Sequence, residues 1–263
     1  MEKRALVHKT ANKSDLTNIS SFLRDTDYYW QIYNNSHEQK LCRIHGTVTH
    51  NIPRNICILC ERDQRDKENK WIEDRDKRNK FYEQSNLKKQ YSHFKIEEFK
   101  FDKNNIEDIK AHDHVKRFII QNESFNFNAL FLGSGGNGKT TMSQIVANHY
   151  IKNLRQALYI KYYQLDYNNL KFDEINITQI KKSPFLIIDE IFSTNVYQGK
   201  EILHNIIDTR YYENLPTILI ANKTEAEFKK EINEMHISLW TKIREKMYSG
   251  KSIFCFSGKN RRI

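Results

Sequence analysis

The stretch ALFLGSGGNGKTT, residues 129–141, joins a short apolar run to a glycine-rich turn, and the helix-like sequence MSQIVANHYIKN follows directly. Residues 133–140 match the pattern G-x-x-x-x-G-K-[ST]. In this pattern, backbone N–H groups of the turn and of the helix N-terminus point at a bound polyphosphate. Four of the chain's eight glycines lie in the turn, which makes a chance match improbable. The stretch therefore predicts a strand, a phosphate-binding loop and a helix in succession.

An ATP molecule at this loop would meet side chains as well as backbone N–H groups. Lys139 is expected to neutralise charge on the β- and γ-phosphates, and the Thr140 hydroxyl is a predicted ligand of Mg²⁺. Glycine is needed because a side chain would keep the backbone from approaching the anion. The predicted nucleotide-contacting residues are Gly133, Ser134, Gly135, Gly136, Asn137, Gly138, Lys139, Thr140 and Thr141.

Two further apolar runs end in polar residues that suit ATP hydrolysis. The run FLIIDE ends in Asp189 and Glu190. Asp189 is expected to hold Mg²⁺, directly or through water, and Glu190 to orient and deprotonate the attacking water. The run TILIAN ends in Asn222, whose side chain is expected to hydrogen-bond the attacking water or the γ-phosphate from between the two motifs. The alternative for Asn222 is an ordinary turn residue at a strand end.

The fold class follows from the alternation of apolar runs with amphipathic segments. The runs NALFLGS, QALYIKY, PFLIIDE and LPTILIAN are separated by sequence of helical length. Parallel strands need such crossover connections, so the pattern predicts an α/β fold, a parallel sheet flanked by helices, over residues 94–263.

A different kind of module is expected over residues 1–65. Cys42 and His45 form one pair with two residues between them, and Cys57 and Cys60 form another. Four such ligands suit tetrahedral Zn²⁺ in a structural site. His50 competes with His45 as the fourth ligand but lacks the spacing, and the alternative to a metal site is a set of unlinked cysteines. Cys255, in the apolar stretch IFCF, is expected to be an ordinary buried residue.

Residues 66–93 are expected to connect the two modules as a charged helical linker. The chain has neither glycine nor proline between Pro53 and Gly133, and the stretch mixes both signs of charge with few apolar residues. Such a sequence favours a solvated helix, because it has too little apolar surface for a core. A disordered linker is the main alternative.

Charge and hydropathy restrict the partners and the compartment. Lys and Arg number 43 against 33 Asp and Glu, a net charge of +10, which favours a polyanion such as nucleic acid. An AT-rich genome would also produce a Lys-rich, Asn-rich composition. No apolar run reaches the roughly 18–20 residues that span a bilayer, and the N-terminus lacks a signal-peptide core. The expected location is therefore the cytoplasm, without membrane association.

These motifs, together with the C-terminal segment, resemble the DnaC/DnaI family of bacterial and phage helicase loaders, which are AAA+ ATPases of the initiator type. The resemblance covers roughly residues 40–263 and is carried by GSGGNGKTT, FLIIDE, IIDTRYYENLPTILIAN and KIREKMYSGKSIFCFSGKNRR. It implies the AAA+ fold and assembly-dependent ATP hydrolysis.

The resemblance also implies roles for particular arginines. An Arg-Tyr pair ends a helix before the third strand in this family, and Arg210 and Tyr211 match it. Arg244 stands where the arginine finger enters the ATP site of a neighbouring subunit, although Ile replaces the usual Ser before it. Arg261 stands where a sensor arginine contacts the γ-phosphate of its own site, with Arg262 as the alternative.

By resemblance, the chain is expected to be an ATP-dependent loader that binds the replicative hexameric DNA helicase and single-stranded DNA during initiation of replication. Residues 1–65 would bind the helicase, and subunits would self-assemble through their ATP sites. The alternatives are a transposition helper ATPase of the IstB type, in which the zinc pairs are not expected, and a phage decoy that occupies a host helicase or loader.

Single-stranded DNA contacts are expected after the second strand of the sheet. Aromatic rings stack on bases and lysines meet phosphates, so the candidate residues are Lys161, Tyr162, Tyr163, Tyr167 and Lys171. Packing at the edge of the core and solvated surface are the alternatives for each of them.

Overall fold

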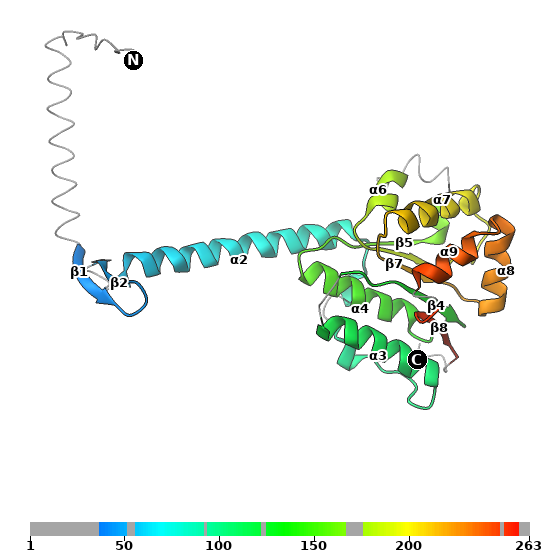
Figure 1. Cartoon of the computed structure of the whole chain (residues 1–263), viewed down its shortest axis with the longest axis horizontal. Coiled ribbons are helices and arrows are strands. Elements are labelled where there is room, and N and C mark those ends of the chain that lie inside the picture. Colours follow the sequence, from blue (N-terminus) through cyan, green and yellow to red (C-terminus); the bar gives the residue numbers. More distant parts are fainter. Residues whose placement is uncertain are drawn as a thin grey trace, which may run out of the picture. The chain divides into compact units, whose positions relative to one another are not determined.

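The computed structural model describes residues 37–51, 56–91, 94–121, 125–166, 176–247 and 250–257. The chain divides into two compact units, residues 1–73 and 74–263 (Figure 1). Within the described residues, no helix combines the length and the apolar character needed to cross a membrane.

The first unit contains a small antiparallel sheet and the beginning of a long helix. The strands pair in the order β1-β2-β3, and Gly46 takes a left-handed φ of 72° where β1 turns into β2. The elements are β1 (His37–Cys42), β2 (Gly46–Asn51), β3 (Ile56–Cys57) and α2 (Ile58–Gln84). A sheet of three short strands has little apolar surface to bury, so this unit needs another source of stability, as small scaffolds generally do.

Helix α2 confirms the expectation of a charged helix rather than a disordered segment. It buries none of its 27 residues. Acidic residues stand four positions before basic ones, as in Glu61 with Arg65 and Asp66 with Lys70, which is the favourable order for a helix. The helix ends at Gln84, and Ser85 is fully buried in the second unit, where its carbonyl accepts a hydrogen bond from Tyr159 N at 2.8 Å. The exposed helix therefore both begins and ends earlier than the predicted linker of residues 66–93.

The second unit is built on a five-stranded sheet with the order β5-β6-β7-β4-β8, in which every pairing is parallel. The predicted parallel α/β fold is thus confirmed. Its strands are β4 (Ala129–Gly133), β5 (Leu158–Lys161), β6 (Leu186–Asp189), β7 (Thr217–Ile220) and β8 (Ile253–Phe256).

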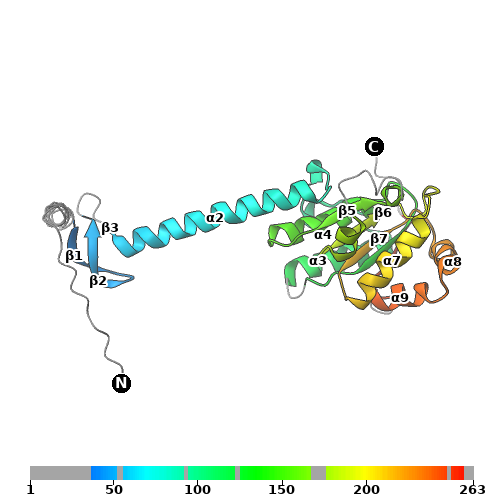
Figure 2. The same ribbon diagram turned by 90° about the horizontal axis from the view of Figure 1, so that it is seen from above.

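Helices cover both faces of this sheet (Figures 1 and 2). On one face, alternate strand residues such as Phe131 and Ile187 pack with α3 and α4. On the other face, their neighbours such as Leu132 and Ile188 pack with α6, α7, α8 and α9. The helical elements are η1 (Lys89–Tyr91), η2 (Ile96–Glu98), α3 (Ile106–Gln121), α4 (Lys139–Lys152), η3 (Tyr162–Leu165), α6 (Ile177–Lys182), α7 (Gly199–Tyr212), α8 (Glu225–Met235) and α9 (Leu239–Lys246).

The fifth strand, β8, was not among the four runs that the sequence analysis identified. It forms the edge of the sheet beside β4, and Cys255 in it is half-buried rather than fully buried, whereas Phe254 and Phe256 on either side of it are buried. The contact with β4 is close. A Cβ atom added to Gly133 would lie 1.9 Å from the carbonyl oxygen of Phe256, so only glycine fits there.

Arg210 is a structural cross-link inside the second unit. It is fully buried in α7. Its guanidinium donates to Thr217 Oγ1 at 2.9 Å and to the carbonyl oxygens of Ser183 at 2.8 Å and Pro216 at 2.5 Å. Ser183 and Pro216 precede β6 and β7, and Thr217 is the first residue of β7, so the arginine of the Arg-Tyr pair joins α7 to the beginnings of two strands.

Candidate functional site

Residues from three separate predicted motifs meet in one cavity of about 890 Å³, although Gly133 and Ser134 are not among those that line it. The carboxyl ends of parallel strands lie at one edge of a sheet, and β7 stands between β4 and β6, so the segments after these strands converge. The cavity is lined by Lys88, Tyr91, Phe94, Glu98, Phe99, Lys100, Gly135, Gly136, Asn137, Gly138, Lys139, Thr140, Thr141, Tyr159, Lys161, Asp189, Glu190 and Asn222.

The glycine-rich loop has the backbone that its sequence predicts. Gly136 and Gly138 have φ values of 88° and 90°, and Gly138 is the N-cap of α4. Asn137 is almost fully buried, and its Nδ2 donates to Ser134 Oγ at 3.2 Å and to the carbonyl oxygen of Phe256 at 3.0 Å. The Asn137 side chain therefore anchors the loop to β8, while the backbone of the loop faces the cavity.

Lys139 lies folded across the loop. Its Nζ donates to the carbonyl oxygens of Gly133 at 2.8 Å and Ser134 at 2.5 Å, and the side chain is 4% exposed. An ammonium group buried at the N-terminus of α4 concentrates positive charge there, next to the N–H groups of the helix. This combination is suited to an anion such as a phosphate chain.

Asp189 is held by three hydrogen-bond donors. Its Oδ2 accepts from Thr140 Oγ1 at 2.7 Å and from Tyr159 Oη at 2.8 Å, and its Oδ1 accepts from Glu190 N at 2.7 Å. A carboxylate and a hydroxyl oxygen side by side are the ligand types that Mg²⁺ prefers beside a phosphate. The residues present thus fit a magnesium ion held between Thr140 and Asp189.

Glu190 projects into the same cavity from a strained backbone. Its φ is 58°, which is uncommon for a non-glycine residue, and such strain often marks functional sites. Both carboxylate oxygens accept from Lys161 Nζ at 3.0 Å. Lys161 was expected to meet DNA phosphates, but in this structure its ammonium neutralises Glu190. Asn222 is exposed and lines the cavity from the end of β7.

The other predicted DNA-contacting residues are distributed differently. Tyr162 is buried in the core beside α7, and burial raises its pKa to about 12, so its ring is not available for stacking on bases. Tyr163 is 48% exposed and keeps an accessible ring. Tyr167 and Lys171 lie outside the described residues.

Of the arginines implied by the resemblance to contact ATP, the structure describes Arg244 alone. Arg244 lies in the last turn of α9, is exposed, and is not among the residues that line the cavity. It thus lies on the surface and away from this cavity. Arg261 and Arg262 lie outside the described residues.

Residues 88–91 and 94–100 supply one end of the cavity, which was not predicted from the sequence. This segment brings the aromatic side chains of Tyr91 and Phe94 towards the loop, and η1 is fixed to α4 by a hydrogen bond from Asn148 Nδ2 to the Tyr91 carbonyl oxygen. The only signal in the sequence is an aromatic residue every few positions among lysines, which is common in linkers.

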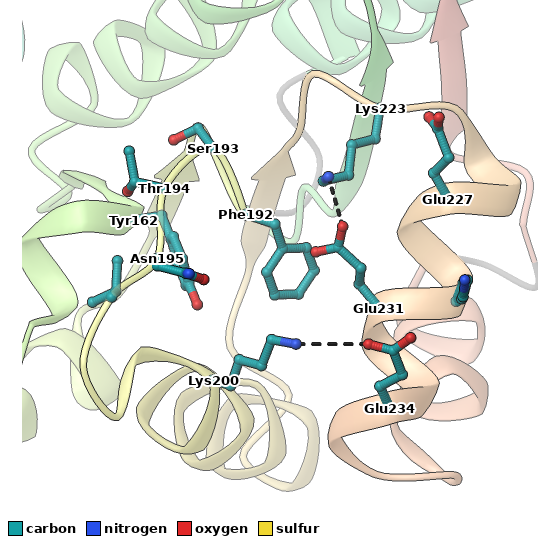
Figure 3. A pocket seen from close by; sticks show the side chains of 12 residues that line it. Tyr162, Phe192, Ser193, Thr194, Asn195, Lys200, Lys223, Glu227, Glu231 and Glu234 are labelled. Carbon is teal, nitrogen blue, oxygen red and sulfur yellow. Dashed lines mark ion pairs between the residues drawn. The ribbon is translucent and has the colours of Figure 1, made fainter.

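A second cavity of about 650 Å³ lies beyond the ends of β6 and β7 (Figure 3). Three lysines and three glutamates line it, and two pairs are in contact: Lys223 Nζ lies 2.6 Å from Glu231 Oε1, and Lys200 Nζ lies 3.7 Å from Glu234 Oε2. Phe192 lines the same space. Because these charges cancel and no phosphate-binding loop faces it, the first cavity is the better nucleotide site.

The first unit brings its Cys and His residues together. The ligand atoms of Cys42, His45, Cys57 and Cys60 all lie within 4.8 Å of one another. Cys42 Sγ is 3.6 Å from Cys60 Sγ, and His45 Nδ1 is 3.4 Å from Cys60 Sγ. Tetrahedral ligands about 2.3 Å from zinc would be roughly 3.8 Å apart, so the group has the dimensions of a zinc site. His50 lies in β2, where the structure describes the backbone alone.

Two further features favour a metal at this group. His45 Nε2 lies 3.0 Å from Asp63 Oδ2, and a carboxylate on the far nitrogen is the usual way to orient a metal-binding histidine. Backbone N–H groups of His45 and Ile44 lower the pKa of Cys42 to about 6, and the hydrogen bond with Cys42 raises the pKa of Cys60 to about 11. A divalent cation would allow both sulfurs to bind as thiolates, because its charge offsets theirs.

Comparison with known proteins shows a likeness of fold. No protein-family model and no curated protein matches the sequence. A crystal structure of DnaI has a TM-score of 0.52 and 22% identity, over 68% of this chain and 95% of the chain in that structure. A crystal structure of the DnaC helicase loader has a TM-score of 0.51 and 18% identity, over 65% of this chain and 100% of the chain in that structure.

Replication initiator DnaA, bound to AMPPCP and single-stranded DNA, has a TM-score of 0.50 and 20% identity, over 67% of this chain and 53% of DnaA. The chain thus spans about half the length of that initiator. At these identities the likeness concerns the fold alone: the second unit shares the α/β fold of the DnaI, DnaC and DnaA structures, as the resemblance implied.

Proposed function

We propose that this chain is an ATP-dependent helicase loader that acts in the initiation of DNA replication. The observation that carries the proposal is the contact between the two nucleotide motifs. Thr140, from the glycine-rich loop, and Asp189, from the end of β6, are joined by a 2.7 Å hydrogen bond in a fold shared with DnaC and DnaI.

In this proposal the loop and α4 N-terminus bind the phosphates, and Lys139 turns from the loop carbonyls to the β- and γ-phosphates. Thr140 and Asp189 hold Mg²⁺, which offsets the charge of the phosphates. Glu190 takes the proton of the attacking water once Lys161 no longer neutralises it, and Asn222 orients that water. The segment with Tyr91 and Phe94 surrounds the base.

The partners are inferred from the neighbours in fold and from charge. DnaC is described as a helicase loader, and the DnaA structure contains single-stranded DNA. For this chain we infer that residues 1–65, with a structural zinc, bind a hexameric replicative helicase. The ATPase unit binds single-stranded DNA, for which a net charge of +10 provides attraction.

Co-purification with a hexameric replicative helicase, with and without ATP, tests this function. We expect the chain and the helicase to form a stable complex in the presence of ATP, and this complex to dissociate when ATP is hydrolysed. A transposition helper would leave the helicase unbound in both conditions, which contradicts the proposal. A decoy would bind the helicase equally with and without ATP and would not hydrolyse ATP. That result would contradict the loader function and favour the non-enzymatic decoy.

Arg244→Ala is expected to leave ATP binding within about twofold of the wild type while turnover in the assembled state falls at least a hundredfold, because an arginine supplied by a neighbour stabilises the transition state alone. ATPase rates measured across a range of protein concentration check this. Lys251→Ala, which removes another exposed cation nearby, is the control and should retain turnover. A loss of ATP affinity in Arg244→Ala would instead assign this arginine to its own subunit's site.

A further inference from the structure

The outer strand β5 carries two donors that reach the carboxylates at the end of β6. Lys161 contacts Glu190, and Tyr159 contacts Asp189. The register explains the second contact: Tyr159 stands opposite Ile187, two residues before Asp189 on the same face of the sheet. A long side chain can reach this diagonal neighbour, and the Tyr159 hydroxyl does so at 2.8 Å.

Tyr159 is itself firmly placed. It is 4% exposed, and its ring belongs to the apolar core between the sheet and the helices α3 and α4. Its backbone N–H donates to the Ser85 carbonyl oxygen, which fixes the open edge of β5.

Metal binding in the proposed site would break one of the three hydrogen bonds to Asp189 and leave the other two in place. Thr140 shares Oδ2 of Asp189 with Tyr159, but the Thr140 hydroxyl is needed as a metal ligand in the proposed site. Once it turns towards the metal, Tyr159 is the side-chain donor that still holds this oxygen. Glu190 N holds the other oxygen through the backbone.

We propose that Tyr159 is a positioning residue, whose hydroxyl holds the Asp189 carboxylate in the orientation that receives Mg²⁺ beside Thr140. This inference rests on the proposed nucleotide site. It predicts that the Tyr159 hydroxyl increases the affinity for Mg²⁺ in the presence of nucleotide. The affinity for nucleotide without Mg²⁺ should not depend on this hydroxyl, because Tyr159 contacts Asp189 and not the nucleotide.

Tyr159→Phe is the direct test, because it keeps the buried ring and removes one hydroxyl. Binding of the fluorescent analogue MANT-ATP is measured in EDTA and then during titration with Mg²⁺. In EDTA the variant should match the wild type. The Mg²⁺ concentration for half-maximal enhancement of binding should rise about tenfold, as expected for losing a hydrogen bond to a charged group. A rise of less than twofold overturns the proposal.

Two controls separate positioning from a general loss of packing. Tyr150→Phe also removes a buried phenol that makes a hydrogen bond, accepted from Phe127 N at 3.1 Å, but it lies in the core away from Asp189. It should leave the Mg²⁺ requirement unchanged, and an equal rise in this variant overturns the specific role of Tyr159. In an Asp189→Asn background, Tyr159→Phe should have no further effect on the Mg²⁺ requirement.

The wild type itself distinguishes this inference from the proposed function. If wild-type protein binds MANT-ATP in neither condition, the nucleotide site is wrong and the inference fails with it. If the wild type shows enhancement by Mg²⁺ and Tyr159→Phe shows the same requirement, the role of Tyr159 alone is wrong.

Discussion

Lys139→Ala should lower the affinity for ATP about a thousandfold, to the point where binding is no longer measurable. The ammonium is expected to contact two phosphates, and each hydrogen bond between charged partners contributes roughly 2 kcal/mol. The buried setting of Lys139 strengthens both contacts, because the charge is little screened by water. Calorimetric or fluorescence titration with ATP and Mg²⁺ provides the measurement.

A matched control for Lys139→Ala lies on the same helix. Lys152 is an exposed lysine in the last turn of α4, so Lys152→Ala removes an equal charge far from the glycine-rich loop. This variant should bind ATP as the wild type does. Wild-type affinity in a folded Lys139→Ala variant would refute the assignment of the loop as the phosphate site.

Removal of the metal should unfold the first unit. We expect about one zinc per chain, because the four ligands form one compact group. In zinc-finger peptides a structural zinc contributes roughly 10 kcal/mol or more, and the small sheet of this unit has little apolar core to replace it. Cys57→Ser should therefore contain no stoichiometric zinc, and residues 37–60 should become sensitive to proteolysis.

Cys255→Ser is the control for the zinc prediction, since Cys255 lies in β8 of the second unit. It should keep a full complement of zinc when metal content is determined by mass spectrometry. Protein purified without chelators that contains no zinc, or a Cys57→Ser variant that retains it, would contradict the proposed metal centre.

The parts of the site that were predictable from the sequence are those fixed by local chemistry. Gly136 and Gly138 indicate a left-handed backbone conformation that other residues rarely adopt, and both have a positive φ in the structure. Asp189 and Asn222 each follow an apolar strand, and parallel strands bring their ends to one edge. The joining of Thr140 to Asp189 follows from these two facts together.

The parts that were not predictable depend on how neighbouring strands are paired and on which strand lies at the edge of the sheet. The contact of Tyr159 with Asp189 exists because Lys161 pairs with Asp189 across β5 and β6, and no local pattern states that register. For the same reason, Lys161 looked like a surface lysine suited to DNA. Strand β8 was missed because its run IFCF is short and only alternately buried at the sheet edge.

The roles of the site residues remain predictions that depend on where ATP binds. Hydrogen–deuterium exchange with and without a non-hydrolysable ATP analogue and Mg²⁺ locates the ligand directly. Exchange should slow in peptides that cover residues 133–141 and 186–190 together, while α8 serves as an internal reference without change. Saturating nucleotide that protects neither segment, or that protects only the residues around the second cavity, would contradict the proposed clasp of ATP between the glycine-rich loop and the Asp189–Glu190 pair.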